Sequence, residues 1–226
     1  MEDLGERGIV LVVTLLVMLM MSALGAALVL ITSSETMIAA NFRNSREALH
    51  AAEAAAERAM SDLGSVADWS QVLNGGVRST FVDGLSTGTR ALQDGTTLDL
   101  AQVSNQANCH RSTTCSGADM DAVTAERPWG ANNPRWQMYA YGPLTDLLPR
   151  PAVDSPYYAV VLVGDDSSEN DNDPLRDGAS QANPGSGVVA LRAQAFGPRG
   201  ARKIIDLTIA RAAHGAIRVL SWRESR

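Results

Sequence analysis

Three aspartates with the spacing of metal ligands stand in one acidic stretch of the sequence. Asp171, Asp173 and Asp177 lie in DDSSENDNDPLRDG, residues 165–178, between two segments that have the composition of strands. Carboxylates separated by turn residues can surround a hard cation such as calcium. The stretch lacks the glycine and the distant glutamate of an EF-hand loop in their required places. Calcium is therefore one hypothesis for this stretch, and a solvated acidic turn is the other.

The two cysteines, Cys109 and Cys115, lie close together in a segment rich in Ser, Thr, Asn and Gly. A near pair of this kind is typical of one local disulfide formed in an oxidising compartment. His110 stands between them, but zinc takes four ligands and the sequence has no second cluster to supply them. A disulfide is the preferred interpretation, and two free thiols or a metal site are the alternatives.

No group of residues in the sequence has the pattern of a catalytic site. The three histidines lie in a helical segment, in the cysteine segment and near the C-terminus, at His50, His110 and His214. No Ser-His-Asp order, nucleophile elbow or phosphate loop accompanies them. We therefore expect no enzyme activity. The net charge of -6 also argues against nucleic acid as the main partner, because binding phosphate needs clustered positive charge.

The N-terminus has an apolar segment long enough to cross a membrane. Residues 9–31 carry no charge, and about 20 such residues span a bilayer as a helix. The leader before them, MEDLGERG, lacks the basic start of an ordinary secretory signal. Cleavage after Gly8 would remove this leader and keep the apolar helix. A plain single-pass anchor is the alternative interpretation.

The sequence after residue 31 predicts that this helix continues. Residues 32–63 contain no proline, are dense in Ala, Glu, Arg, Leu and Met, and end before Gly64, a natural C-terminal cap. A helix over residues 9–63 would be roughly 80 Å long. Small and apolar residues at spacings of three and four predict a face that packs against protein, at Met37, Ala40, Asn44, Ala48, Ala51 and Ala55.

Strands are predicted in the C-terminal part of the chain. Four segments have the residue types and alternation of strands, at residues 135–142, 157–164, 187–197 and 201–211. Residues 197–200, Gly-Pro-Arg-Gly, predict a tight hairpin between the last two. Four aromatic residues are expected in the core or between helix and sheet, at Trp129, Trp136, Tyr139 and Tyr141, and a ligand-binding aromatic surface is the alternative. The sequence thus predicts an α+β fold in which the second half of one long N-terminal helix packs on an antiparallel β-sheet.

Residues 7–63 resemble a known family in four features. These are a Gly-led apolar helix, a Glu near its exit, an Ala-Asn-x-Arg-Asn element and a closing Ala-Ala-Glu-Ala, at Gly8, Glu35, residues 40–44 and residues 51–54. The segment is similar to the N-terminus of PilX-type minor pilins of type IV pili. The resemblance implies a pilin-like fold, cleavage by prepilin peptidase between Gly8 and Ile9, and methylation of the new Ile9 amine.

The predicted organisation has five parts. A leader (1–8) precedes the transmembrane and assembly helix (9–63), a loop-rich connection with the disulfide (64–133), the sheet (134–211) and a basic tail (212–226). Within the connection, residues 77–82 and 96–103 are short candidates for strands or turns. By resemblance the helix spans the inner membrane once, the C-terminal domain is periplasmic, and the subunit later joins a pilus at the cell surface.

One position departs from the pattern of major pilins. Those proteins carry a glutamate at the fifth mature position, whereas this chain, counted from Ile9, has Val13. A carboxylate at that depth costs about 2.5 to 3.5 kcal/mol to insert unless it is paired. A subunit without it cannot pair with the amine of a neighbouring subunit. The absence therefore favours a priming or tip position over the repeating shaft.

The resemblance implies a minor pilin that primes, helps assemble or caps a type IV pilus, with other pilins as partners through the N-terminal helix. Such a subunit would support cell adhesion, twitching motility, DNA uptake or secretion. Two alternatives stay open. One is a pseudopilin of a type II secretion machine, and the other is a membrane-tethered periplasmic binding protein.

Overall fold

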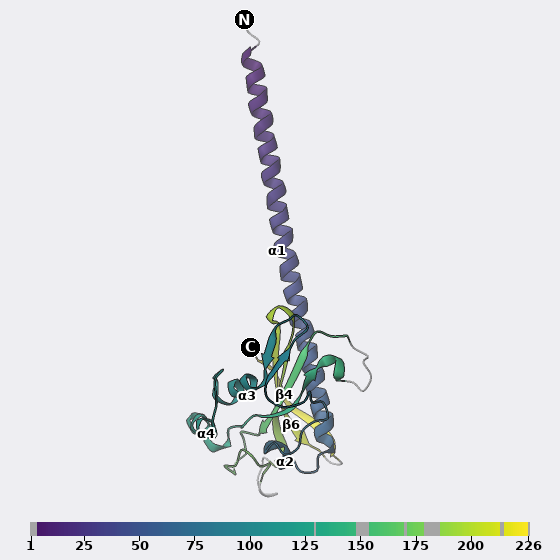
Figure 1. The fold of residues 1–226 in the computed structure, drawn as a ribbon, viewed down its shortest axis with the longest axis vertical. Coiled ribbons are helices and arrows are strands. Elements are labelled where there is room, and N and C mark those ends of the chain that lie inside the picture. The colour runs from purple at the N-terminus through teal and green to yellow at the C-terminus, as the bar shows by residue number, and fades with distance from the viewer. Residues whose placement is uncertain are drawn as a thin grey trace. The chain divides into compact units, whose positions relative to one another are not determined.

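The computed structural model describes residues 4–128, 130–147, 154–169, 171–178, 186–212 and 215–225 (Figure 1). The chain divides into two compact units, Met1–Arg43 and Asn44–Arg226. One helix, α1 (Leu4–Ser65), contributes residues to both. Because α1 encloses residues 9–63, the long helix predicted from the sequence is confirmed.

The first unit is helical, and its hydroxyl side chains form hydrogen bonds within the helix. Thr14 Oγ1 donates to the Leu11 carbonyl at 2.9 Å, and Thr32 Oγ1 donates to the Leu28 carbonyl at 2.7 Å. Thr36 Oγ1 in turn donates to the Thr32 carbonyl at 2.8 Å. Hydroxyl groups bonded in this way need no water, which suits a helix in apolar surroundings.

In its described residues, the second unit contains the end of α1, three further α-helices and two sheets. The helices are α2 (Ser70–Leu73), α3 (Leu100–Cys109) and α4 (Gly117–Glu126), and the 3-10 turns are η1 (Gly130–Asn132), η2 (Leu144–Asp146) and η3 (Pro198–Gly200). The small sheet pairs β1 (Thr89–Ala91) with β2 (Thr97–Asp99). The main sheet has the order β3 (Gln137–Pro143), β4 (Tyr158–Asp165), β5 (Val188–Phe196), β6 (Arg202–Arg211) and β7 (Ile217–Ser225).

Each strand of the main sheet pairs antiparallel with its neighbour in the sequence, so the predicted antiparallel sheet is confirmed. The turn η3 joins β5 to β6, where the hairpin was expected. Gly197 is required at its start, because a Cβ atom there would lie 2.0 Å from the Tyr157 ring. Tyr157 also donates from its hydroxyl to the Asn44 carbonyl of α1 at 2.9 Å.

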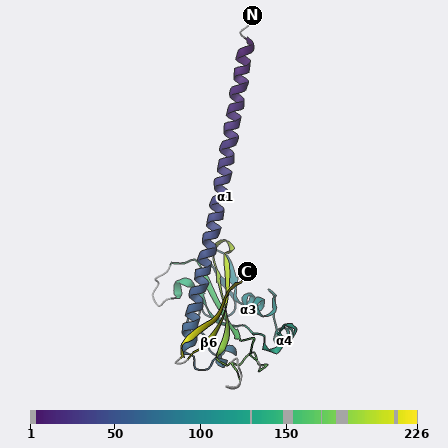
Figure 2. The same cartoon turned by 180° about the vertical axis from the view of Figure 1, so that it is seen from behind.

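Alternation along the strands gives the main sheet two buried faces. Val161 and Val163 of β4 belong to a core that includes residues of α1 after Asn44, whereas Val160 and Leu162 belong to a second core with α3. The end of α1 and α3 therefore cover opposite faces of the sheet (Figures 1 and 2). This is the α+β, pilin-like arrangement that the sequence predicts.

The part of α1 within the second unit contacts the sheet through small residues. Its buried positions, each at most 2% exposed, are Ala48, Ala51, Ala52, Ala55, Ala56, Ala59 and Leu63. Ala48, Ala51 and Ala55 are among the residues that the spacing places on the packing face. Alanine on this face lets the helix backbone lie close to the sheet and loses no side-chain entropy when it is buried.

Two segments differ from the expected structure. The C-terminal segment, predicted as a tail, contains β7, which pairs with β6. The connection, predicted as loop-rich, contains α3 and α4. Asp99 caps α3 by accepting from the amide of Ala101 at 2.8 Å, and Ser116 and Asp119 form a capping box that begins α4.

Three of the four expected core aromatic residues lie in the described part of the chain and are buried. Tyr139 belongs to the core shared with α1, and Trp136 and Tyr141 belong to the core shared with α3. Trp129 lies outside the described residues. Of the two short candidates, residues 96–103 divide into β2 and the start of α3, and Val82 makes an isolated bridge with Tyr141.

Candidate functional sites

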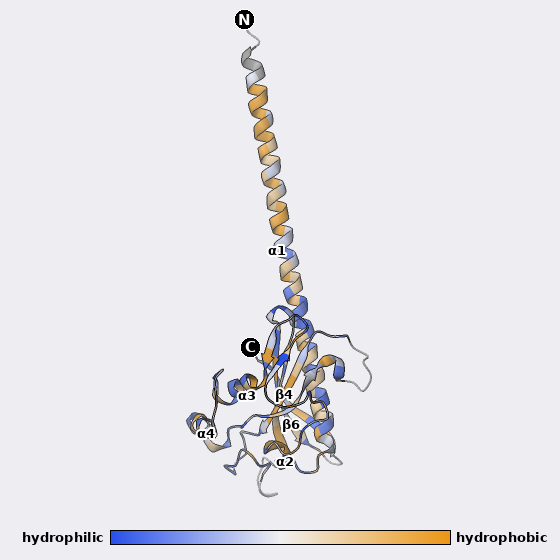
Figure 3. Cartoon of the chain, viewed as in Figure 1, coloured by the Kyte–Doolittle hydropathy of each residue, from blue (hydrophilic) through white to orange (hydrophobic). Residues whose placement is uncertain are grey.

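The first unit consists mainly of apolar residues (Figure 3). The large apolar side chains between Ile9 and Ile38 are 47 to 69% exposed. Among the described residues one helix, Gly8–Ser65, is long and apolar enough to cross a membrane, a test that a signal sequence near the N-terminus would also pass. Exposure of this much apolar surface is unfavourable in water, so it indicates a partner outside the chain.

Gly8, the residue before the predicted cleavage point, has no packing role in this structure. It lies in α1 and is exposed, and a Cβ atom built on it would meet nothing within 4 Å. Ile9, which follows, is 66% exposed, and Val13 is 51% exposed. A glycine within a helix is less favourable than alanine by up to about 1 kcal/mol, so neither packing nor helix propensity accounts for Gly8.

The predicted disulfide pair joins two helices of the second unit. A disulfide bond links Cys109, the last residue of α3, to Cys115, which precedes the N-cap of α4, with Cα atoms 6.0 Å apart. His110 between them adopts a left-handed conformation, with φ of 55°, and ends α3. The adjacent Asn108 accepts from the Trp136 amide at 2.7 Å and donates to the Trp136 carbonyl at 2.9 Å. These bonds attach α3 to β3.

The structure brings together three carboxylates at the end of β4. One oxygen from each of Asp165, Glu169 and Asp171 lies within 4.8 Å of the other two. Asp165 and Glu169 are 0% and 1% exposed, and Asp171 is half-buried. Burial and the nearby Glu169 carboxylate raise the pKa of Asp165 to about 9. Burial and contact with Asp171 raise the pKa of Glu169 to about 7.

Only Asp171 of the three sequence-predicted metal ligands belongs to this carboxylate cluster. Asp173 Oδ1 accepts from the Leu175 amide at 3.2 Å and so stabilises a turn. Asp177 Oδ1 accepts from the Gly187 amide at 2.7 Å, and burial raises the pKa of its carboxyl group. Asp165 was not placed in this cluster from the sequence, although its position in the strand alternation after Val161 and Val163 could have indicated that its side chain points inward.

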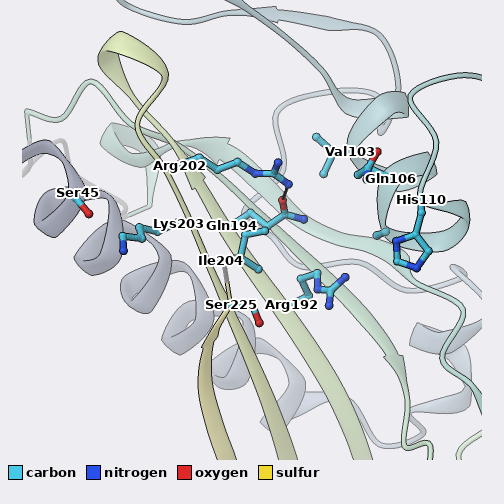
Figure 4. Close-up of a pocket in the computed structure, with 11 residues that line it drawn as sticks. Ser45, Val103, Gln106, His110, Arg192, Gln194, Arg202, Lys203, Ile204 and Ser225 are labelled. Atoms are coloured by element: carbon cyan, nitrogen blue, oxygen red, sulfur yellow. Dashed lines mark hydrogen bonds between the residues drawn. The ribbon is translucent and has the colours of Figure 1, made fainter. Parts of the chain in front are cut away.

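A cleft of about 650 Å³ lies on the α3 side of the sheet (Figure 4). Its basic residues are bonded to protein. Arg192 Nε donates to Asp206 Oδ1 at 2.7 Å, Arg202 donates to Gln194 Oε1 at 2.7 Å, and Lys203 pairs with Glu224. Arg192 and Lys203 thus have acidic partners, whereas Arg202 bonds the neutral Gln194 amide and lies over the Phe196 ring, with the guanidinium carbon 5.3 Å from the ring centroid.

Asp206 is the acidic partner of Arg192. Burial alone would raise the pKa of its carboxyl group, but hydrogen bonds from Arg192 and Ser225 and the charge of Arg192 outweigh burial. The pKa of Asp206 therefore lies below its ordinary value.

Besides His110, the structure describes one other histidine, His50. Its ring bonds Glu53 on the exposed side of α1 at 2.9 Å, and His214 lies outside the described residues.

The fold and the exposed apolar helix together define the chain as pilin-like. A comparison with protein families then matches residues 7–57 to the family described as PilX N-terminal, which supports a PilX-type pilin. The matched segment includes Gly8, Ile9 and the alanine-rich start of the packing face. No curated protein and no solved structure matches the chain.

Proposed function

We propose that this protein is a minor pilin that primes or caps a type IV pilus. The PilX N-terminal match supports a minor pilin, and the observation that carries the finer proposal is Val13 in a helix whose apolar surface is exposed. A filament shaft repeats the same contact, so a subunit that offers no carboxylate to the next amine is best placed where no such contact is needed. Its role is structural and not catalytic.

The proposed location follows from the same features. Residues 9–31 would hold the subunit in the inner membrane before assembly, with the second unit in the periplasm, where an oxidising environment supports the Cys109–Cys115 bond. Cleavage by prepilin peptidase after Gly8 would free the Ile9 amine. Other pilins would then contact the apolar surface that lipid covered before assembly.

Deletion of the gene in its own host, followed by complementation, tests this function. If the protein primes assembly, pilus number falls in the deletion strain and returns with the wild-type chain. If it caps the filament, pilus number persists, adhesion falls, and immunogold label on the second unit lies at filament ends. Label spread evenly along the shaft would contradict both positions.

The same strain separates the alternatives. Normal pili with failed secretion of folded proteins would identify a type II pseudopilin. Normal pili and normal secretion would favour a membrane-tethered binding protein. In the cleft, Arg192 and Lys203 already have acidic partners within the chain, which weighs against that last alternative.

A further inference from the structure

The carboxylate cluster at the end of β4 contains buried oxygen atoms that the described protein does not satisfy. Asp165 is 0% exposed, and neither of its carboxylate oxygens has a hydrogen-bond partner among the described residues. Within the same described part, Asp171 Oδ2 is also buried without a partner, while its Oδ1 accepts from the Asp173 amide at 2.8 Å. Buried polar atoms without partners are rare and costly in native proteins.

Among the described residues, no arginine or lysine forms a salt bridge with Asp165 or Asp171. Arg211 donates to the Ala67 and Val66 carbonyls at 2.7 and 2.9 Å. Arg223 of β7 pairs with Asp206 at 3.2 Å. Arg211 and Arg223 are thus engaged at other sites.

We propose that Asp165, Glu169 and Asp171 bind one calcium ion. Calcium takes oxygen ligands at about 2.3–2.6 Å, so two oxygens on opposite sides of one ion are about 4.6–5.2 Å apart. The three oxygens of the cluster lie within 4.8 Å of one another and fit this limit. The set has no histidine or cysteine, which zinc prefers. Magnesium usually keeps several waters, which a buried set of carboxylates does not favour.

Calcium binding would fix the loop between β4 and β5 to the rest of the second unit. This loop already makes two long-range hydrogen bonds, from the Asn172 amide to Asn132 Oδ1 at 2.8 Å and from the Asp177 amide to Ser70 Oγ at 3.2 Å. Without the ion, repulsion among the carboxylates opposes their simultaneous ionisation in the folded chain. The bound ion removes the repulsion, so it stabilises only the folded chain.

Equilibrium dialysis of the full chain in detergent, stripped with EGTA, tests the site directly with radioactive calcium. The wild type is expected to bind one ion per chain, and its melting temperature is expected to rise by several degrees with calcium and less with magnesium. Asp165→Asn should weaken binding about tenfold or more. In EGTA the same variant should melt no lower than the wild type, because burial and the Glu169 carboxylate already keep the Asp165 side chain neutral in the metal-free chain.

Asp173→Asn is the matched control, since it makes the same charge change in the same loop outside the cluster. An asparagine Oδ1 can still accept from the Leu175 amide, so the turn is kept. This variant should bind calcium as the wild type does. The proposal is overturned if the wild type binds no calcium at millimolar concentration, if the two variants bind alike, or if magnesium binds as tightly as calcium.

Discussion

Residues 9–38 and 48–63 belong to the same helix, yet their side chains have opposite surroundings. The earlier segment has large apolar residues that are 47 to 69% exposed, and the later segment has seven buried positions, six of them alanine. The later segment packs against its own sheet. The earlier segment has large apolar side chains suited to contact lipid or another subunit. Side-chain size therefore separates a contact made within the subunit from one made outside it.

The largest effect is expected where the buried segment ends. Trp69 is 0% exposed, donates from Nε1 to the Leu63 carbonyl at 3.0 Å, and has the Arg211 guanidinium 4.6 Å from its ring. Trp69→Ala should lower the free energy of unfolding by about 3–5 kcal/mol. Trp222→Ala, at a 49% exposed residue of β7, is the control and should cost far less. Thermal melts of the chains in detergent compare the two, and equal losses would contradict this packing.

The alanine face provides the next test of the comparison. Ala52 is 0% exposed, so Ala52→Leu should force the helix from the sheet and cost about 1–3 kcal/mol of stability. Ala27→Leu makes the same change at an exposed position of the earlier segment. It should leave the melting temperature unchanged. If Ala52→Leu is equally harmless, the close approach of α1 to the sheet is wrong.

The sequence predicted α1, four strands and the β5–β6 hairpin because periodicity and turn residues agree there. It missed β7 because that strand is exposed on both sides and therefore shows no alternation of buried and exposed residues. A register shift at Thr208/Ile209 leaves Leu220 opposite no residue and interrupts the pattern further. It missed α3 and α4 because they lie in a polar segment without clear periodicity. Their first turns are stabilised by the N-cap residues Asp99 and Ser116, which are of types also common in loops.

The candidate sites depend on the sequence in different ways. The proposed cleavage site and Val13 lie within six residues of one another, so local pattern is enough to propose them. The carboxylate cluster depends on the inward side chain of Asp165 and on the fold of the loop that returns Glu169 and Asp171 to it. Spacing alone favoured Asp173 and Asp177 as members of a metal site. Their side-chain oxygens instead accept hydrogen bonds from the backbone amides of Leu175 and Gly187. Tertiary contacts determine which acidic side chains lie close together, and spacing in the sequence does not encode those contacts.

The smallest effect contrasts the apolar core between α1 and the sheet with the ion pairs of Asp206. The pKa of Asp206 is lower in the folded chain than its ordinary value of 3.8. The carboxylate therefore stabilises the folded chain at pH values above 3.8, and this contribution is lost as the pH falls through the folded pKa. Asp206→Asn should cost about 1 kcal/mol at pH 7 and less below pH 4. Denaturant titrations of both chains at each pH measure this difference. A constant difference would contradict the role of the charge.

Processing of the N-terminus tests the pilin account most directly. The wild type, Gly8→Ala and Gly25→Ala would be expressed in a host with prepilin peptidase, and the membrane-extracted chains would be sequenced from the N-terminus. Gly25 is the matched control, because a Cβ atom at either glycine meets nothing within 4 Å. The account predicts Ile9 as the first residue of the wild type and of Gly25→Ala, and Met1 for Gly8→Ala. A wild-type chain that begins at Met1, or beyond the apolar helix, would contradict it.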